Sequence, residues 1–385
     1  MKFTFLIYSY FPYGGQQRDF LKIAKQLLER GHSIDVYALR WQGQTPDGMN
    51  VTIVPVKAFN RIKLYQRYSE WVLAALAGKE KTCVVGFSKM PGLDVYFAAD
   101  PCFLEKADLL RGWYYKFTAR YRHFKHYEQA VVGEGSQVEV LLISPQQRTA
   151  FLNYYPNSKS RLHDLPPGIE RNRRVKKRQP EKRSSIRAEL KIPESTLLLL
   201  QIGSGFKVKG VDRSLQAIAS LPLALKKRVH YLLIGQDNSR RFTKLAQKLE
   251  LEKQVTVLPG RDDVPDLLQA ADLMLHPAYS ESAGYVLLES TISGLPILCT
   301  ASCGYAFHIL QAESGKVCPS PFQQSELNAL LAEMLDDLPT STWSQKGIEY
   351  GHTENLYEMA SVAADFIEEK AASLLRDNTA AVASK

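Results

Sequence analysis

Residues 2–31, KFTFLIYSYFPYGGQQRDFLKIAKQLLERG, combine three features that indicate one type of fold. A short apolar run at the start is typical of a buried strand, and a turn containing Gly14 and Gly15 follows it. Apolar residues then recur at helical spacing from Phe20 to Leu28, and a glycine ends the helix. A buried strand, a glycine turn and an amphipathic helix form the repeating unit of an α/β fold with a parallel sheet.

The same alternation continues along the chain. Further short apolar runs stand at 33–39, 82–88, 94–100, 138–144, 197–205, 229–235, 254–260, 272–277 and 296–300. Amphipathic stretches such as 214–221 and 242–251 separate them. The pattern predicts two Rossmann-like, doubly wound domains. Because such sheets bind ligands beyond the carboxyl ends of their strands, we expect a central cleft lined by the loops that follow strands.

A basic segment separates the two halves of the chain. Residues 166–193 are rich in proline and positive charge and poor in large apolar side chains, which favours an exposed connection. We therefore place a first Rossmann-like domain at 1–168 and a second at 169–355. We expect a helix at 356–375 that packs back on the first domain. The last residues, 376–385, have no apolar period and are predicted to be disordered.

Composition limits the possible functions. The net charge of +9 favours polyanionic partners, which could be nucleic acid, an anionic membrane or a phosphorylated substrate. The 5 cysteines include no C-x-x-C pair, so we expect neither a disulfide scaffold nor a zinc site, and a reducing cytoplasm fits best. No run approaches the roughly 18 apolar residues that span a bilayer, so any membrane contact would be peripheral.

Two glycine-rich loops follow predicted strands. Gly14 and Gly15 either leave helix amides free to bind an anion or only form a tight turn. Asp19, just beyond them, either faces a sugar or stabilises the helix N-terminus. The loop at 203–210 matches neither the dinucleotide fingerprint nor the P-loop. Its Lys207 and Lys209 either clamp a diphosphate or are solvated.

A third loop contains Arg261, which could stack on a nucleobase because guanidinium planes pack well on π-faces. Asp262 and Asp263 follow it. An adjacent pair of aspartates could hold a metal, but one of them is better explained as the N-cap of the helix at 264–272.

The stretch AYSESAGYVLLEST contains two glutamates, Glu281 and Glu289, spaced eight residues apart. The spacing alone has no weight, because Glu181 and Glu189 share it. A strand, loop and helix are predicted here, so the amides of residues 282–284 lie at a helix N-terminus, where they can bind phosphate or sugar oxygens. Glu281 then lies in the loop and Glu289 lies inside the helix.

Taken together, these residues resemble the retaining glycosyltransferases of family 4, which have the GT-B fold. The likeness is narrower still to the lipopolysaccharide core glucosyltransferases of Gram-negative bacteria. It runs from Met1 to about Phe366 and rests on YFPYGGQQRDF, VGFSKMPGLDVYFAAD, RYRHF, LPPGI, KGVDRS, MLHPAY and SGLPIL. It implies a UDP-hexose donor, UDP-glucose in the best-known members, bound by residues 169–355, and a heptose of the lipid A inner core as acceptor, bound by residues 1–168. Lys209 and helix N-terminal amides can stabilise the charge on the leaving UDP, and the sequence contains no Asp-x-Asp, so we expect no metal or other cofactor.

The resemblance also implies roles for single residues. Glu281 and Lys209 would act on the donor sugar and the leaving diphosphate, and Asp100 would act on the acceptor side. Arg261 would pack by the uracil and Glu289 would hold the ribose. The complete implied donor site is Gly14, Gly15, Asp19, Arg173, Gly203, Lys207, Lys209, Arg261, Ser282, Ala283, Gly284, Val286 and Glu289.

One position departs from the family pattern. Val208 stands where close relatives usually have an arginine, so one phosphate-binding side chain is missing. Either Lys207 substitutes for it or the donor binds more weakly.

Residues 109–127 interleave basic and aromatic side chains. The same composition suits a helix on an anionic leaflet, nucleic-acid binding, or a half-buried helix with a solvated face. Because the expected acceptor is a lipid, we favour the membrane alternative, with the protein on the cytoplasmic face of the inner membrane. We expect no nucleic-acid partner. The predicted membrane-facing residues are Arg111, Trp113, Lys116, Arg120, Arg122 and Lys125. The alternatives to the glucosyltransferase are a related enzyme with another UDP-hexose or a UDP-N-acetylhexosamine, or a basic nucleic-acid-binding protein.

Overall fold

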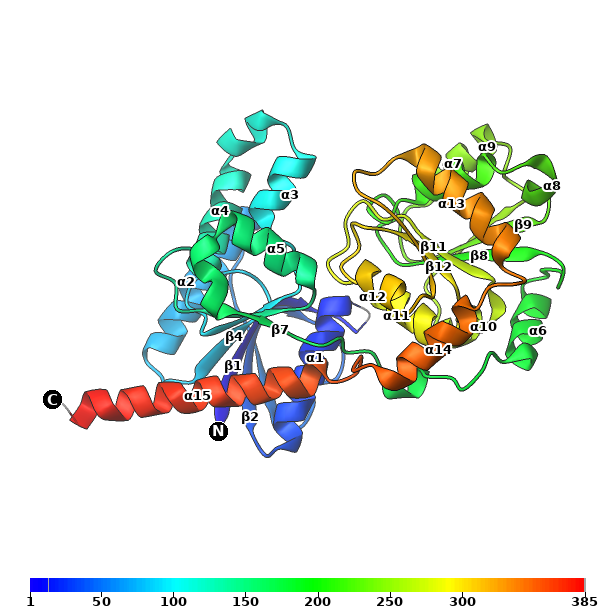
Figure 1. The fold of residues 1–385 in the computed structure, drawn as a ribbon. Helices are drawn as coiled ribbons and strands as arrows, with labels where there is room; N and C mark the ends of the chain where they lie inside the picture. Colours follow the sequence, from blue (N-terminus) through cyan, green and yellow to red (C-terminus); the bar gives the residue numbers. More distant parts are fainter. Residues whose placement is uncertain (13, 384–385) are drawn as a thin grey trace. The chain divides into compact units, whose positions relative to one another are not determined.

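A computed structural model describes residues 1–12 and 14–383 of the chain, with side chains as far as residue 376. The chain divides into two units (Figure 1). The N-terminal unit comprises Met1–Gly168 and Glu358–Lys385, and the C-terminal unit comprises Ile169–Tyr357. Each is built on one parallel sheet with helices on both faces, which confirms the predicted α/β class.

The N-terminal unit contains a seven-stranded sheet with the order β3-β2-β1-β4-β5-β6-β7. Its strands are β1 (Lys2–Tyr10), β2 (Ser33–Trp41), β3 (Met49–Ile53), β4 (Cys83–Gly86), β5 (Val95–Ala98), β6 (Glu139–Leu142) and β7 (Leu162–Asp164). Phe3 pairs with Ile34 on one side and with Cys83 on the other. The strand order therefore reverses between β1 and β4, which makes this the topological switch point.

Helices cover both faces of this sheet. They are α1 (Gly15–Glu29), α2 (Arg61–Ala77), α3 (Phe103–Leu110), α4 (Ala119–Val132), α5 (Pro145–Tyr154) and α15 (Met359–Ala383), with the 3-10 helices η1 (Trp113–Phe117) and η2 (Pro156–Arg161). Helices α2, α4 and α5 enclose an apolar core on one face. Helices α1 and α15 lie against each other on the opposite face (Figure 1).

The C-terminal unit has a six-stranded sheet with the order β10-β9-β8-β11-β12-β13. Its strands are β8 (Leu197–Ile202), β9 (Val229–Ile234), β10 (Val255–Leu258), β11 (Leu273–His276), β12 (Ile297–Thr300) and β13 (Gly315–Cys318). Its helices are α6 (Pro180–Glu189), α7 (Val211–Ala219), α8 (Leu223–Lys226), α9 (Arg240–Lys248), α10 (Val264–Ala270), α11 (Tyr285–Ile292), α12 (Ala306–Gln311), α13 (Gln324–Asp337), α14 (Trp343–Thr353) and the 3-10 helix η3 (Arg171–Arg173). Here the switch point lies between β8 and β11.

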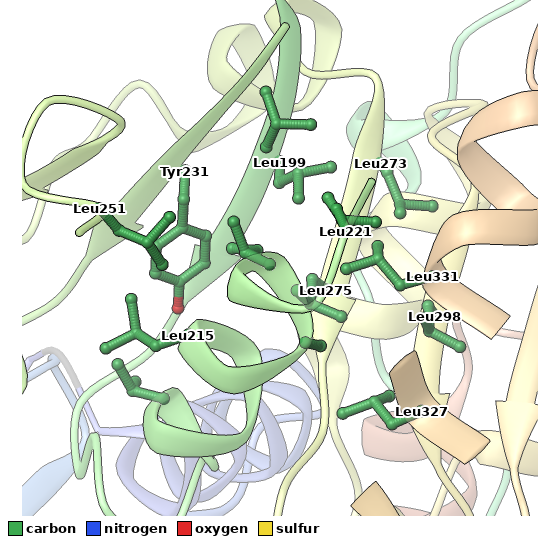
Figure 2. Packing of buried hydrophobic residues seen from close by; sticks show 14 of the residues in the cluster. Leu199, Leu215, Leu221, Tyr231, Leu251, Leu273, Leu275, Leu298, Leu327 and Leu331 are labelled. Carbon is green, nitrogen blue, oxygen red and sulfur yellow. The ribbon is translucent and has the colours of Figure 1, made fainter. Parts of the chain in front are cut away.

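Alternate residues of the β8–β11 strands face opposite cores, as parallel strands buried on both faces require. Figure 2 shows the core formed with α7, α9 and α13, in which Leu199, Leu215 and Leu331 are buried. The neighbouring residues Leu198 and Leu200 belong to the other core, with α6, α10, α11 and α12. The five cysteines are free and buried, as expected for a chain without disulfides.

Three strands were missed by the sequence analysis. They are the outermost strands β3 and β7 of the first sheet and β13 of the second. Only one of the five residues of β3, and only one of the four residues of β13, is buried. Edge strands of this kind carry no continuous apolar run, so hydrophobic patterning does not detect them.

The expectation of an exposed connection at 166–193 is wrong for its second half. Residues 180–189 form α6, which packs against α10. Arg187 is 1% exposed and bonds to Asp272 at 2.6 Å, while Arg178 donates to three carbonyls at the end of α10. Basic side chains are attracted to the carbonyls at a helix C-terminus, so charged groups anchor this segment in addition to the buried Ile186 and Ile192.

The predicted disorder from residue 376 is also corrected, because α15 continues to Ala383. Alanine, common in this stretch, has the highest helix propensity, and extending an existing helix avoids the cost of nucleation. Residues 384 and 385 of the predicted tail lie outside the described residues. Near its start, α15 is held to the end of α1 by Arg30, which bonds to Glu368 at 2.6 Å and to Asp365 at 2.7 Å.

Candidate functional site

Two loops meet at the switch point of the C-terminal unit. Residues 203–210 follow β8 and residues 277–284 follow β11. The N–H of Tyr279 donates to the carbonyl of Val208 at 2.7 Å. Gly210 begins α7 with a φ of +71°, and a Cβ there would lie 2.0 Å from the Pro277 oxygen. Both the backbone conformation and the close approach require glycine at this position.

Lys209 and Glu281, both predicted catalytic residues, form an ion pair across these loops. Gln201, in the buried interior of β8, fixes the backbone of Lys209 by donating to its carbonyl at 2.7 Å. The other end of the Gln201 amide accepts hydrogen bonds from Ser214 and Tyr231. A network satisfied on both sides holds Lys209 in a defined position.

The ion pair lies in a largely dry environment. Burial lowers the pKa of Lys209. His276 is completely buried with its Nε2 3.5 Å from Glu281, and burial together with the charge of Lys209 lowers the pKa of His276 to about 3. His276 is therefore neutral near pH 7. Lys209 and Glu281 form the ion pair of this site, and a low dielectric strengthens the attraction of Lys209 for a bound anion.

The loop that carries Glu281 is held in place by backbone hydrogen bonds to residues 302–305. The Glu281 N–H donates to Ser302 at 3.2 Å, and the Tyr305 N–H donates to the carbonyl of Ala283 at 2.8 Å. Within residues 1–12 and 14–383, the N–H groups of Ala283 and Gly284 donate to no other group. Gly284 precedes α11 with a φ of +99°. These amides at a helix N-terminus can bind an anionic oxygen.

A second candidate site lies in the N-terminal unit, at the carboxyl ends of β1, β4 and β5. A cavity of about 510 Å³ opens there, and its lining includes Asp100 just after β5. Ser9 of β1 and Ser88 after β4 also line it. The cavity thus occupies the switch point of its own sheet, where doubly wound folds bind ligands.

Known proteins are similar to this chain in sequence and in fold. The family model "Glycosyl transferases group 1" matches residues 182–349. "Lipopolysaccharide glucosyltransferase WaaG" of Escherichia coli (strain K12) is 42% identical over 365 residues, which cover 94% of this chain and 98% of the relative. The chain belongs to the group 1 glycosyltransferases.

Solved structures of other proteins have the same fold as this glycosyltransferase. The crystal structure of WaaG, titled a glycosyltransferase involved in lipopolysaccharide biosynthesis, matches with a TM-score of 0.89 over 95% of this chain and 99% of that chain. A sucrose-phosphate synthase from Thermosynechococcus elongatus shares the fold, with a TM-score of 0.74 at 18% identity. The likeness to WaaG confirms the predicted GT-B fold class.

Other predicted donor residues of the glycosyltransferase lie around the same loops. Gly203 has a φ of +136° and would place a Cβ 3.4 Å from the Lys209 side chain, so this lysine passes close over the glycine. Lys207 is exposed. Ser282 precedes the free amides, and Val286 and Glu289 are half-buried residues within α11. The two glutamates of the stretch therefore lie in different surroundings, as predicted.

Arg261 has a more complex position than predicted. It bonds to Asp263 at 2.5 and 2.7 Å and to Glu189 of α6 at 2.9 Å. Asp263 stands at the N-cap position of α10 but makes no capping hydrogen bond, because its carboxylate pairs with Arg261. Arg173 lies on η3, with its Nε 3.9 Å from Glu170. That Arg261 packs by a base and that Arg173 contacts phosphate stay predictions.

Three predicted donor residues belong to the N-terminal unit. Gly14 precedes α1 in an extended conformation, where a Cβ would collide with the side chain of Gln17. Gly15 has open space around it. Asp19 is 3% exposed and lies in the second turn of α1, too far along the helix to act as a cap.

The basic aromatic segment is not one helix. Helix α3 ends at Leu110 with Arg111 as its C-cap, η1 follows after Gly112, and Thr118 caps the start of α4 by accepting a hydrogen bond from the N–H of Tyr121. Large apolar side chains are exposed on this turn, with Leu109 at 75%, Trp113 at 77% and Phe117 at 73%. No helix among residues 1–12 and 14–383 is long and apolar enough to cross a bilayer.

Sequence reasoning missed most of the cavity around Asp100. Tyr8 and Tyr65 stack there at 3.8 Å, and Arg61 and Lys106 line it. A usable signal existed, since Ser9 near the end of β1, Ser88 after β4 and Asp100 after β5 lie at the carboxyl ends of three adjacent strands. Arg61 and Tyr65 begin α2, far from these residues in sequence, so only the fold brings them to the cavity.

Proposed function

We propose that this chain is a retaining transferase that moves glucose from UDP-glucose to a heptose of the lipopolysaccharide inner core. The observation that carries the proposal is the 42% identity, over 94% of the chain, to a protein named as a lipopolysaccharide glucosyltransferase. Another UDP-hexose or a UDP-N-acetylhexosamine is the alternative donor, because few pocket contacts separate these sugars.

The donor loops account for the cleavage step. When the bond between the glucose C1 and the β-phosphate oxygen breaks, negative charge grows on the departing UDP. Lys209 and the amides of Ala283 and Gly284 would stabilise that charge. Glu281 would then exchange its contact with Lys209 for hydroxyls of the sugar, and Glu289 would hold the ribose. Since the chain itself supplies the positive charge, we expect no metal requirement and UDP release that is unchanged in EDTA.

The N-terminal unit would hold the acceptor. A heptose hydroxyl forms the new bond to C1 and gives up its proton. Asp100, which is exposed at the cavity after β5, is our candidate to take that proton or to act as a nucleophile. An Asp100→Asn enzyme with unchanged kcat would remove Asp100 from the mechanism.

A peripheral position on the cytoplasmic face of the inner membrane fits this acceptor. The exposed apolar turn formed by Leu109, Leu110, Trp113, Tyr114 and Phe117, here called the aromatic tip, would enter the interface of an anionic leaflet. The basic residues near it, which include Lys116, Arg122 and Lys125, would contact lipid headgroups. We propose a membrane partner and no nucleic acid.

Thermal shift separates the proposal from nucleic-acid binding. UDP at concentrations far above its Kd should raise the Tm of the full chain, also at high salt. An oligonucleotide should raise it only at low salt, because phosphate contacts by basic residues weaken steeply with ionic strength. Stabilisation by the oligonucleotide alone would refute the transferase. UDP release from a panel of UDP-sugars, with a heptose-terminated acceptor, would then identify the donor.

A further inference from the structure

The cavity in the N-terminal unit has an unusual charge balance. Cations from α2, α3, α4 and the loops after β4 and α3 line it, and Asp100 is the acidic residue among its lining. The lining cations are Arg61, Lys89, Lys106, Arg111 and Arg120. A cavity of about 510 Å³ lies within the common size range of small-molecule sites, about 300–1,000 Å³.

One of these cations is neutralised within the protein. Lys89 bonds to the completely buried carboxylate of Glu128 at 2.5 Å. Glu128 also accepts hydrogen bonds from the backbone N–H groups of Phe103 and Leu104, at 2.6 and 3.1 Å. This network fixes the start of α3 directly behind Asp100, so the floor of the cavity is preorganised.

The other four cations are available to a ligand. Within the part of the chain that the structure describes, Arg61, Lys106, Arg111 and Arg120 form no ion pair with a carboxylate. Rings of the same unit support two of them, since Arg111 lies over Tyr115 and Arg120 lies over Phe124. Against the one carboxylate of Asp100, the cavity keeps a positive surplus.

Aromatic faces accompany these charges. Tyr65 stacks on Tyr8, and its hydroxyl lies in the electrostatic field of Arg61, Arg120 and Asp100. Aromatic rings pack well on the C–H faces of sugar rings, whereas guanidinium groups bind carboxylate or phosphate oxygens. The lining therefore suits a sugar that carries an acidic group.

We propose that this cavity binds an acidic glycan, and that Arg61 and Arg120 hold a carboxylate or phosphate beside the sugar that accepts glucose. The role as acceptor site rests on the function proposed above. Arg111 and Arg120, which the sequence predicted to face the membrane, then bind the glycan, while the aromatic tip contacts the lipid. One segment would thus hold both ends of a lipid-linked acceptor.

The test is a binding titration of the full chain with a deacylated, heptose-terminated inner-core oligosaccharide, which removes any membrane contribution. Three forms are compared: the intact oligosaccharide, the carboxyl-reduced form and the dephosphorylated form. Arg61→Gln/Arg120→Gln is compared with Lys25→Gln/Lys63→Gln, which removes the same charge from exposed positions of α1 and α2 outside the cavity. Lys106→Gln/Arg111→Gln provides a second cavity pair.

We expect each cavity pair to weaken binding of the intact oligosaccharide about tenfold or more, since two charge-assisted hydrogen bonds are lost. The control pair should bind like the wild type. Removing the recognised acidic group from the glycan should weaken its binding to the wild type by the same factor. For that glycan, the cavity variants should bind almost as well as the wild type. The form that loses affinity identifies carboxylate or phosphate.

Equal wild-type affinity for all three forms would overturn the proposal. The proposal would also be overturned if the cavity variants lost the same affinity for the acidic and the neutralised forms of the oligosaccharide. UDP binding and Tm should stay unchanged in these variants. If acidic selectivity holds but no UDP-sugar is turned over, the proposed transfer fails and the acidic-glycan site stands. If transfer occurs without this selectivity, only the cavity proposal fails.

Discussion

Lys209 and Glu281 form a half-buried ion pair, with side-chain exposures of 20% and 17%. A diphosphate that approaches Lys209 must compete with the Glu281 carboxylate. The competition is favourable only if other positive groups help to bind the phosphates. Lys207 is exposed on the same loop, and Val208, 48% exposed, stands where the family resemblance led us to expect an arginine.

Val208→Arg should therefore strengthen donor binding. We expect the KM for UDP-glucose to fall by about three- to tenfold, because a partly exposed charge-assisted hydrogen bond to phosphate is worth roughly 1 kcal/mol. Steady-state kinetics at saturating acceptor measure it, with Val208→Gln as the uncharged control. An unchanged KM together with a raised KM in Lys207→Gln would show that Lys207 already occupies the phosphate contact.

Sequence reasoning was most successful at the residue scale where chemistry depends on loops after strands. It placed Lys209 and Glu281 in one site, and the structure pairs them. It could not find Gln201, which holds Lys209, because a buried glutamine inside a strand has no distinctive local pattern. Nor could it foresee that Glu189, set aside as a chance match, binds Arg261.

At the scale of elements, α6 shows why a charged segment can be part of a core. Arg187 donates to Ala270, Pro193, Thr196 and Asp272. These bonds join α6, the end of α10 and the start of the second sheet. Hydrophobic patterning assigns such a segment to a linker because Ile186 is the one apolar residue that α6 buries, beside the buried Arg187.

Replacing Arg187 should destabilise the C-terminal unit strongly. We expect Arg187→Met to cost about 3–5 kcal/mol, since Asp272 and several carbonyls lose their buried partner. Lys182 also lies on α6, and it forms an exposed ion pair with Asp266 of α10. Lys182→Met removes this pair and should cost less than about 1 kcal/mol. Thermal unfolding of the full chain with and without UDP compares them. Equal Tm values in the two variants would contradict this account of α6.

The junction of α1 and α15 predicts a pH dependence. Burial raises the pKa of Glu368, but hydrogen bonds from His32 and Arg30 outweigh burial and leave that pKa below its ordinary value of 4.5. A depressed carboxyl pKa contributes stability that is complete above 4.5 and is lost as the pH falls through the folded value.

Glu368→Gln should therefore flatten the fall in stability between about pH 5 and pH 3, by less than about 1 kcal/mol because the carboxylate is partly exposed. Glu369→Gln, which changes an exposed neighbour, serves as the control. Chemical denaturation across this pH range measures the difference. Parallel curves for Glu368→Gln and the wild type would show that this ion pair does not stabilise the junction.

For the whole molecule, the strand and helix order predicted the two parallel sheets, because central strands are continuous apolar runs. The edge strands, α6 and the break between α3 and α4 were not predictable in this way. The edge strands and α6 depend on contacts between distant parts of the chain, whereas the break before α4 has a local signal in the N-cap Thr118, which the helical interpretation of this segment did not use. The basic aromatic segment consequently has two parts, the aromatic tip and the cationic lining of the cavity.

The aromatic tip should dominate membrane attachment. Trp113→Ser/Phe117→Ser should strongly reduce co-flotation of the full chain with anionic vesicles, because two exposed aromatic side chains no longer enter the interface. Phe59→Ser, which changes another exposed phenylalanine of the same unit, should float like the wild type. A wild-type protein that floats equally with neutral vesicles would contradict the role of the basic residues.

The central claim is transfer of glucose to an inner-core heptose with retention of configuration. Its most direct test incubates the full chain with UDP-glucose and a deacylated, heptose-terminated inner-core oligosaccharide, followed by mass spectrometry and NMR of the product. We predict addition of one hexose, joined to heptose through an α-glycosidic bond. An unmodified oligosaccharide, or a β-linked product, would contradict the account.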